Sequence, residues 1–191
     1  MTEVKRRTTA ITEIRNKTKS TSFQATNIEF CCLQTRKILE LIALGSLIAN
    51  KRHFEEQKIK FEKFWHAELI LKDIERLNPN FYPSPIKENP HSNPTIKMDW
   101  QELKEGYLTK EDFLKVYEKC GKIMHADNPF GSKTDLDYYE KQIDIWINKI
   151  IRLLNSHLIK LVDDTNLYLI HMQEERDDKV HVYTFELVGP K

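Results

Sequence analysis

Residues 135–161 read DLDYYEKQIDIWINKIIRLLNSHLIKL and carry the clearest helical pattern of the chain. Large apolar side chains recur three or four residues apart, which places them on one face of a helix. The apolar stripe consists of Tyr139, Ile143, Trp146, Ile150, Leu153, Leu154 and Leu158. We therefore predict a core helix from about Asp135 to Leu161, with Trp146 in its buried stripe.

The segment before this helix predicts another one. Thr109-Lys-Glu-Asp112 has the spacing of a capping box, with Asp in place of the usual Glu, so a helix should begin after Thr109. One face of this helix would carry Phe113, Val116, Tyr117, Cys120 and Met124. Its end is expected at Asn128, because the following Pro129 disfavours helical geometry in the residue before it.

Two more helices are predicted nearer the N-terminus. Over about Ser22–Lys51 the apolar residues keep helical spacing, and the second half is apolar nearly all round. Such a helix is expected to lie among other elements rather than at the surface. A further helix should run over about His53–Leu77, where Asn78-Pro79 ends it.

Prolines and alternating segments complete the pattern. Five prolines between Pro79 and Pro94 forbid helix, so a long connection is expected, with short extended pieces at Phe81-Tyr82 and Ile96–Trp100. Asn166–Gln173 and Lys179–Leu187 alternate and are rich in β-branched and aromatic residues, which predicts a β-hairpin that packs on the helices. The expected fold class is mainly α (α+β): a bundle of about four helices with a C-terminal β-hairpin and a Pro-rich insertion.

Composition and charge indicate the domain organisation. A chain of 191 residues with 40% hydrophobic and 31% charged residues has the size and balance of one globular domain. The net charge of +1 is unevenly distributed, because residues 1–19 carry six basic and two acidic side chains. We expect a basic flexible arm over residues 1–21 and a single helical domain with the hairpin over residues 22–191. Such an arm can contact phosphate backbones, although a solvated terminus is the commoner case.

Cysteine content and hydropathy bear on location. Cys31 and Cys32 are adjacent and Cys120 is remote, so no disulfide framework is predicted and a reducing compartment is the simplest setting. The longest apolar stretch, Ile38–Ala49, is interrupted by Glu40 and is too short to span a bilayer. We expect a cytoplasmic protein with no membrane partner.

One segment has the features of a functional site. Residues 117–131 read YEKCGKIMHADNPFG. A glycine inside a helix costs about 1 kcal/mol relative to alanine, so Gly121 is expected to have a packing or functional reason. It lies one turn before His125 and leaves space beside the imidazole, while Asp127 and Asn128 bring polar side chains to the helix end. The simpler alternative is a helix C-terminus with a favourable histidine, a glycine for tight packing and a proline stop.

This pattern resembles the signature of the HEPN superfamily (higher eukaryotes and prokaryotes nucleotide-binding), a family of helical bundles. The family's active site consists of an arginine, usually an adjacent polar residue, and a following histidine. Placed on this chain, the signature puts the arginine at Cys120, the polar residue at Gly121 and the histidine at His125. The position of the histidine agrees, whereas the arginine and the polar residue are absent. The nearby Lys119 and Lys122 lack the planar fork with which arginine binds phosphate.

The resemblance implies two alternative functions. Many HEPN members look like metal-independent ribonucleases of toxin and antiviral defence systems that work as dimers, which implies contact with RNA or nucleotide, a homodimer and no cofactor. His125 would act as general base or acid, and Arg36 on the central helix would replace the missing arginine. Asp127 or Asn128 would orient the histidine or the substrate, and Tyr117 could contribute a hydroxyl or pack in the core. Other members have lost the motif, which implies a non-catalytic protein-interaction module.

Simpler interpretations remain open for several residues. Arg36 has Glu40 one turn away, so the two side chains could merely neutralise each other. Cys120 falls on the apolar face and is interpreted as a buried structural thiol. His171 and His181 should face each other across the hairpin, but two imidazoles are too few for a metal site. The sequence has no HExxH, CxxC, Gly-rich phosphate loop or GxSxG motif, so the corresponding peptidase, P-loop and hydrolase chemistry is not expected.

Overall fold

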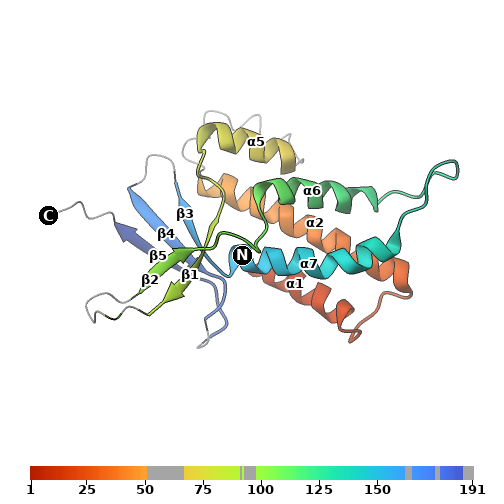
Figure 1. The fold of residues 1–191 in the computed structure, drawn as a ribbon, viewed down its shortest axis with the longest axis horizontal. Coiled ribbons are helices and arrows are strands. Elements are labelled where there is room, and N and C mark those ends of the chain that lie inside the picture. Colours follow the sequence, from red (N-terminus) through yellow and green to blue (C-terminus); the bar gives the residue numbers. More distant parts are fainter. Residues whose placement is uncertain (51–66, 91, 93–97, 162–164, 175–176, 187–191) are drawn as a thin grey trace.

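A computed structural model describes residues 1–50, 67–90, 92, 98–161, 165–174 and 177–186. In this part the chain forms a group of helices beside an antiparallel sheet (Figure 1). The helices are α1 (Thr2–Arg15), α2 (Gln24–Ala49), α5 (Ala67–Leu77), α6 (Lys110–Lys122) and α7 (Leu136–Leu154). The strands are β1 (Ser84–Asn89), β2 (Asp99–Glu102), β3 (Ser156–Lys160), β4 (Asn166–His171) and β5 (His181–Glu186). The fold is therefore α+β, with a larger sheet than the predicted single hairpin.

Helix α2 is the centre of the helical part. It contacts α1, α5, α6 and α7, and its buried side chains face several of these neighbours. The central position predicted for this apolar helix is confirmed. None of the helices in the described part is both long and apolar enough to cross a membrane.

Helix α6 begins as predicted and ends earlier. The Thr109 hydroxyl caps its first turn by accepting a hydrogen bond from the amide of Asp112 at 3.1 Å. The helix ends at Lys122, because the amides of residues 124 and 125 turn back onto carbonyls only three residues before them, at 3.2 and 3.3 Å. The prediction that Asn128 forms the helix end is therefore wrong, and the residues from 124 onward belong to the loop between α6 and α7.

Helix α7 also begins as predicted and stops short of Leu161. The Asp135 carboxylate accepts a hydrogen bond from the amide of Tyr138 at 3.0 Å, and Trp146 is buried in the core as expected. The helix ends at Leu154, because the residues after it form β3, which pairs with β4 over its whole length. The apolar residues of β3 continue the helical spacing by coincidence, so the sequence pattern overestimates the length of the helix.

The N-terminal segment is a helix rather than the flexible arm that its charge predicts. Val4 and Ile11 are seven residues apart, lie on one face of α1 and are buried against the core. At the other end of the helix, Arg15 forms ion pairs with Glu140 at 2.5 Å and Asp144 at 2.8 Å, both on α7. Contacts of this kind with distant parts of the chain hold the segment against the core, and a count of charges does not show them.

The Pro-rich connection supplies two strands of the sheet. Pro85 lies in β1, where only Ser84 and Pro85 pair with β3 and the rest of the strand pairs with β2. Proline is tolerated there because it lies close to the strand end. Helix α5 and its end before Asn78 agree with the prediction, while the first part of the helix predicted over His53–Leu77 falls outside the described residues.

The sheet has the strand order β2-β1-β3-β4-β5 and curls strongly. The predicted hairpin is present as β4 and β5, with His171 opposite His181. Trp100 of β2 and Phe185 of β5 belong to opposite edge strands, yet their ring centroids lie 4.8 Å apart. In Figure 1 the β1–β2 hairpin accordingly lies in front of the other strands. The curl gives the sheet an inner face on which residues of non-neighbouring strands can meet.

Candidate functional site

The contact between α2 and α6 explains Gly121. A Cβ atom at this position would lie 2.5 Å from Nη1 of Arg36, far inside the contact distance of two heavy atoms. The guanidinium group therefore occupies the space that the missing side chain leaves. The space predicted beside Gly121 exists, and a side chain of another helix fills it.

Arg36 is held in this position by two residues. Its Nη2 donates to the Tyr117 hydroxyl at 2.6 Å, and its Nη1 donates to the Tyr117 carbonyl at 3.2 Å. The guanidinium carbon lies 3.8 Å from the centroid of the Tyr117 ring, which is a cation–π contact. The Nε atom lies 3.4 Å from Glu40 Oε1, so the expected pair with Glu40 also forms. Burial raises the pKa of Tyr117, which keeps this hydroxyl protonated at neutral pH.

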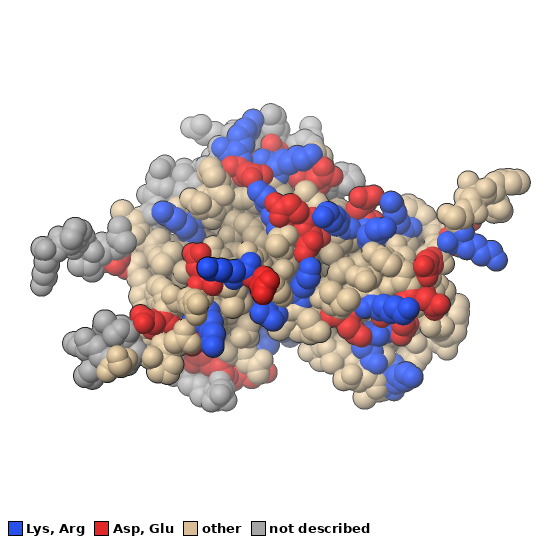
Figure 2. Space-filling model, in the orientation of Figure 1, with Lys and Arg blue, Asp and Glu red and all other residues tan. Residues whose placement is uncertain are grey.

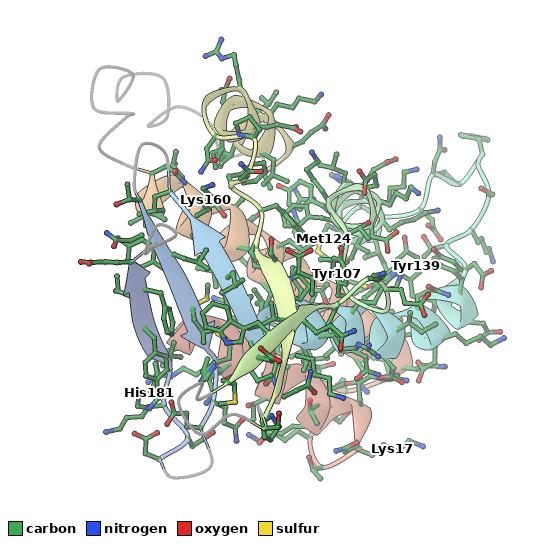
Figure 3. The ribbon with its side chains drawn as sticks, turned by 60° about the vertical axis from the view of Figure 1, so that its left-hand side comes forward. Lys17, Tyr107, Met124, Tyr139, Lys160 and His181 are labelled. Atoms are coloured by element: carbon green, nitrogen blue, oxygen red, sulfur yellow. The ribbon has the colours of Figure 1, made fainter. Side chains whose placement is uncertain are left out.

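A cavity of about 640 Å³ opens beside this contact and is lined by α2, α5, α6 and the start of the following loop. Four of the six predicted site residues line it: Arg36, Tyr117, Gly121 and His125. The remaining lining residues are Glu68, Leu114, Lys115, Glu118, Lys122 and Met124. Met124, in the loop directly after α6, is labelled in Figure 3 and marks this region. The arginine and the histidine that the sequence analysis paired thus share one cavity.

The other two predicted site residues belong to the loop and not to this cavity. The Asp127 carboxylate accepts hydrogen bonds from the amide and the hydroxyl of Thr134, which lower its pKa. The Asn128 side chain accepts from the amide of Phe130 at 3.0 Å. Both side chains therefore shape the loop. The prediction that Asn128 lies in one polar pocket with Arg36 and His125 is wrong, because α6 ends before it could bring Asn128 back to the cavity.

Cys120 is a structural thiol, as the apolar face predicts. Its side chain is fully buried and points to Cys32 on α2 rather than into the cavity. A hydrogen bond with Cys120, together with burial, raises the pKa of the Cys32 thiol. The position that corresponds to the arginine of the HEPN signature is thus part of the core of this chain. Any arginine at the cavity has to come from another helix, and Arg36 does.

The inner face of the sheet carries a second group of polar residues. Nε2 of His171 lies 2.7 Å from Oε1 of Glu88 on β1, and its Nδ1 lies 3.6 Å from Glu174. Nε2 of His181 lies 2.9 Å from Asp177. The two imidazoles thus meet different carboxylates, and within the described residues no group of three or more His, Cys, Asp or Glu side chains could hold a metal ion. The sequence analysis missed Glu88, because the Pro-rich segment around it carries no signal that β1 joins the sheet.

His157 is a further polar residue that the sequence analysis missed. It lies on β3 with no exposed surface, and its Nδ1 lies 2.7 Å from the Leu154 carbonyl. Among the described residues its Nε2 has no hydrogen-bond partner. Burial lowers the pKa of His157 to about 4, so the ring is neutral at pH 7. His157 falls within the helix predicted over Asp135–Leu161, so the sequence pattern did not indicate a buried strand position.

Comparisons of the chain with protein-family models, with curated proteins and with solved structures found no match.

Proposed function

We propose that this chain is a HEPN-like domain that contacts RNA or a nucleotide through the cavity between α2, α5 and α6, with Arg36 as the phosphate-binding residue. The observation that supports this function best is the contact of Arg36 with Gly121, because it brings a guanidinium group to the last turn of α6, one turn before His125. Helices α2, α5, α6 and α7 would form the bundle of such a domain, and the sheet would be an addition to it.

The hydrogen bonds of Arg36 leave part of its binding capacity free. A guanidinium group has five N–H donors; two of them bond to Tyr117, and Nε forms the 3.4 Å ion pair with Glu40. Each terminal nitrogen donates one hydrogen bond and carries a second N–H, which would be available to a phosphate oxygen. The side chain retains 23% of its exposure. Tyr117 and Glu40 would therefore hold the Arg36 guanidinium group in place while leaving N–H donors for a ligand.

The charges that line the cavity also favour an anion. Glu118 is paired with Lys122 at 3.0 Å, and Glu68 is paired with Lys72 at 2.7 Å. No salt bridge of Lys115 occurs within the described part of the chain, and its side chain lines the same cavity. The acidic residues of the cavity are thus neutralised locally, while a lysine remains available to a second phosphate oxygen.

Cleavage of RNA would need more than this cavity contains. His125 is exposed and could act as general acid or base, but general acid–base cleavage uses a second group for the leaving oxygen. A homodimer that brings two such cavities together would supply a second His125. Binding is therefore the proposed activity of one chain, and a metal-independent ribonuclease reaction is proposed for the dimer only.

A non-catalytic protein-interaction module is the second candidate. The burial of Cys120 at the signature position favours it, because this residue has become part of the contact between α2 and α6. In that case Arg36, Tyr117 and Glu40 would serve to join the two helices, and a protein would bind the outer surface of the helices or the sheet.

RNA binding and cleavage by the purified protein, with and without a chelator, separate the two candidates. We expect RNA binding that the chelator does not change. Arg36→Lys keeps the charge and loses the fork, so it should weaken binding by about tenfold or more, as expected when a charge-assisted pair of hydrogen bonds is lost. His125→Ala should weaken binding or abolish any cleavage.

The matched control is Lys160→Ala, which removes one positive charge at the end of β3, outside the cavity (Figure 3). This variant should bind RNA as the wild type does. Equal binding by Arg36→Lys and wild type would contradict the proposed function. A folded wild-type protein that binds neither RNA nor nucleotide would favour the protein-interaction module.

A further inference from the structure

The loop between α6 and α7 presents one aromatic ring to solvent. Phe130 is 97% exposed, more than the other large hydrophobic side chains of the described chain. The loop projects from the helices at the side remote from the sheet (Figure 1). In Figure 2 its tip extends beyond the body of the protein and consists of uncharged residues. An apolar ring in this position has almost its whole surface open to solvent and packs on no side chain of the described residues.

Hydrogen bonds hold this loop in a defined shape. The Gly131 amide donates to the Asn128 carbonyl at 2.9 Å, which closes a turn with Pro129 and Phe130 at its two central positions. The Asn128 side chain accepts from the Phe130 amide at 3.0 Å, and Thr134 ties the base of the loop to Asp127. The ring is thus presented on a preformed turn, which reduces the entropy cost of binding to it.

The surroundings of Phe130 favour a planar polar partner over an apolar protein surface. The loop around it consists mainly of polar residues, whereas the core of a protein interface usually contains a contiguous apolar patch. Proteins that bind single-stranded nucleic acid stack unpaired bases on exposed aromatic rings, and stacking needs one accessible ring face rather than an apolar patch. Asp127 and Asp135, the nearest acidic side chains in sequence, are used in hydrogen bonds to Thr134 and Tyr138.

The loop is also continuous with the proposed phosphate site. His125 lines the cavity and precedes Phe130 by five residues, so at most about 17 Å of extended chain separates them. Building on the proposed function, we infer that Phe130 is a stacking platform for an unpaired base of single-stranded RNA whose phosphate contacts Arg36. The ligand class is thereby narrowed from RNA or nucleotide to single-stranded RNA several nucleotides long.

Binding of a labelled oligouridine of about ten nucleotides, within the usual site size of single-strand binders, tests this inference. Phe130→Ala should weaken binding by about 5- to 150-fold, which is the loss that one stacked base produces. Phe130→Trp should bind at least as well as the wild type, since it keeps a stacking face. A hairpin duplex of comparable length should bind wild type and Phe130→Ala equally, because its bases are already stacked on each other. Val182→Ala, at another exposed apolar residue, is the control and should change nothing.

Each result has a separate meaning. If the wild type binds the oligouridine and Arg36→Lys weakens binding but Phe130→Ala does not, the inference fails and the proposed function stands. The inference also fails if Phe130→Ala weakens single strand and duplex alike. If Phe130→Ala abolishes a self-association that the wild type shows in sedimentation, and leaves RNA affinity unchanged, the ring binds a second copy of the protein and the inference fails. If the wild type binds no RNA, the inference fails, and the proposed function fails with it when the protein binds no nucleotide either.

Discussion

Both α6 and α7 are followed by a histidine three residues after the last helical residue, and the two imidazoles lie in opposite environments. After α6 the chain enters an exposed loop, and His125 borders a cavity that is open to solvent. After α7 the chain enters β3, and His157 is sealed between the sheet and the helices with no exposed surface. The same residue at the same distance from a helix end thus becomes an accessible group in one place and a neutral core residue in the other.

The difference shows that the next element, and not the helix end, determines what a polar residue can do. Strand pairing turns His157 inward and leaves only the Leu154 carbonyl for its Nδ1. A loop without such pairing leaves His125 free to meet a ligand.

Truncating a large side chain in the core between the helices should have the largest effect on stability. Trp146 on α7 is 5% exposed, and its ring lies 6.1 Å from that of Tyr139 in an edge-to-face arrangement. Trp146→Ala should lower the free energy of unfolding by about 3–5 kcal/mol, as for other large buried aromatics. Denaturant titration measures this loss, with the exposed Ile145→Ala on the same helix as control. A loss below about 1 kcal/mol would show that Trp146 does not belong to the core.

Lowering the pH should destabilise the folded protein through protonation of His157. The folded state lowers the pKa of His157 from 6.5 to about 4, so between these values the unfolded chain binds a proton that the folded chain does not. Its contribution to stability is complete above pH 6.5 and is lost as the pH falls toward 4, by about 3 kcal/mol at pH 4.

The unfolding free energy measured from pH 7 to pH 4 for wild type and His157→Leu isolates this contribution from that of the carboxylates. The variant is expected to be less stable at pH 7, because the Leu154 carbonyl loses its partner. Its decline with acid should be shallower than that of the wild type. Parallel curves for the two proteins would contradict the neutral buried imidazole.

The contact of Arg36 with Gly121 should appear as a coupling between the two positions. Gly121→Ala would displace the guanidinium and lose its two hydrogen bonds to Tyr117, so we expect a net loss of about 1 kcal/mol despite the better helix propensity of alanine. In an Arg36→Ala background the same change should stabilise the protein by up to about 1 kcal/mol. A double-mutant cycle measures the difference, about 1–2 kcal/mol.

Gly45 on α2 is the matched control, since a Cβ there would meet no atom within 4 Å. Gly45→Ala should stabilise the protein by about 0.5–1 kcal/mol in either background. Additive effects of Arg36→Ala and Gly121→Ala would show that the guanidinium does not depend on the glycine.

The smallest effect on stability is expected at His125. His125→Ala should change the unfolding free energy by less than about 0.5 kcal/mol, because the exposed side chain has no hydrogen bond in the described part of the chain. Thermal melts of wild type and variant check this, and His157→Ala provides the buried counterpart. A loss comparable to that of His157→Ala would mean that His125 is a structural residue.

Several features of the site could be read from the sequence, because they depend on neighbours along one helix. The spacing of Gly121, His125 and Tyr117 on one segment predicted a shared face, and these residues line one cavity. The proximity of Arg36 was a hypothesis based on the apolar character of its helix, and the packing of α2 on α6 places it there. Asn128 was assigned to the site wrongly, because the end of α6 depends on turns that residue types do not specify.

The starts of α6 and α7, the central α2 and the C-terminal hairpin follow from the amino-acid sequence alone. Capping residues, apolar periodicity and alternation act within a few residues, so their signals are local. Three features depend instead on long-range contacts: residues 2–15 form an anchored helix, the Pro-rich connection adds β1 and β2, and β3 replaces the last turns predicted for α7. The reason is physical: strand pairing and the burial of a few side chains take their free energy from residues far apart in the chain, and these partners leave no mark on the local pattern.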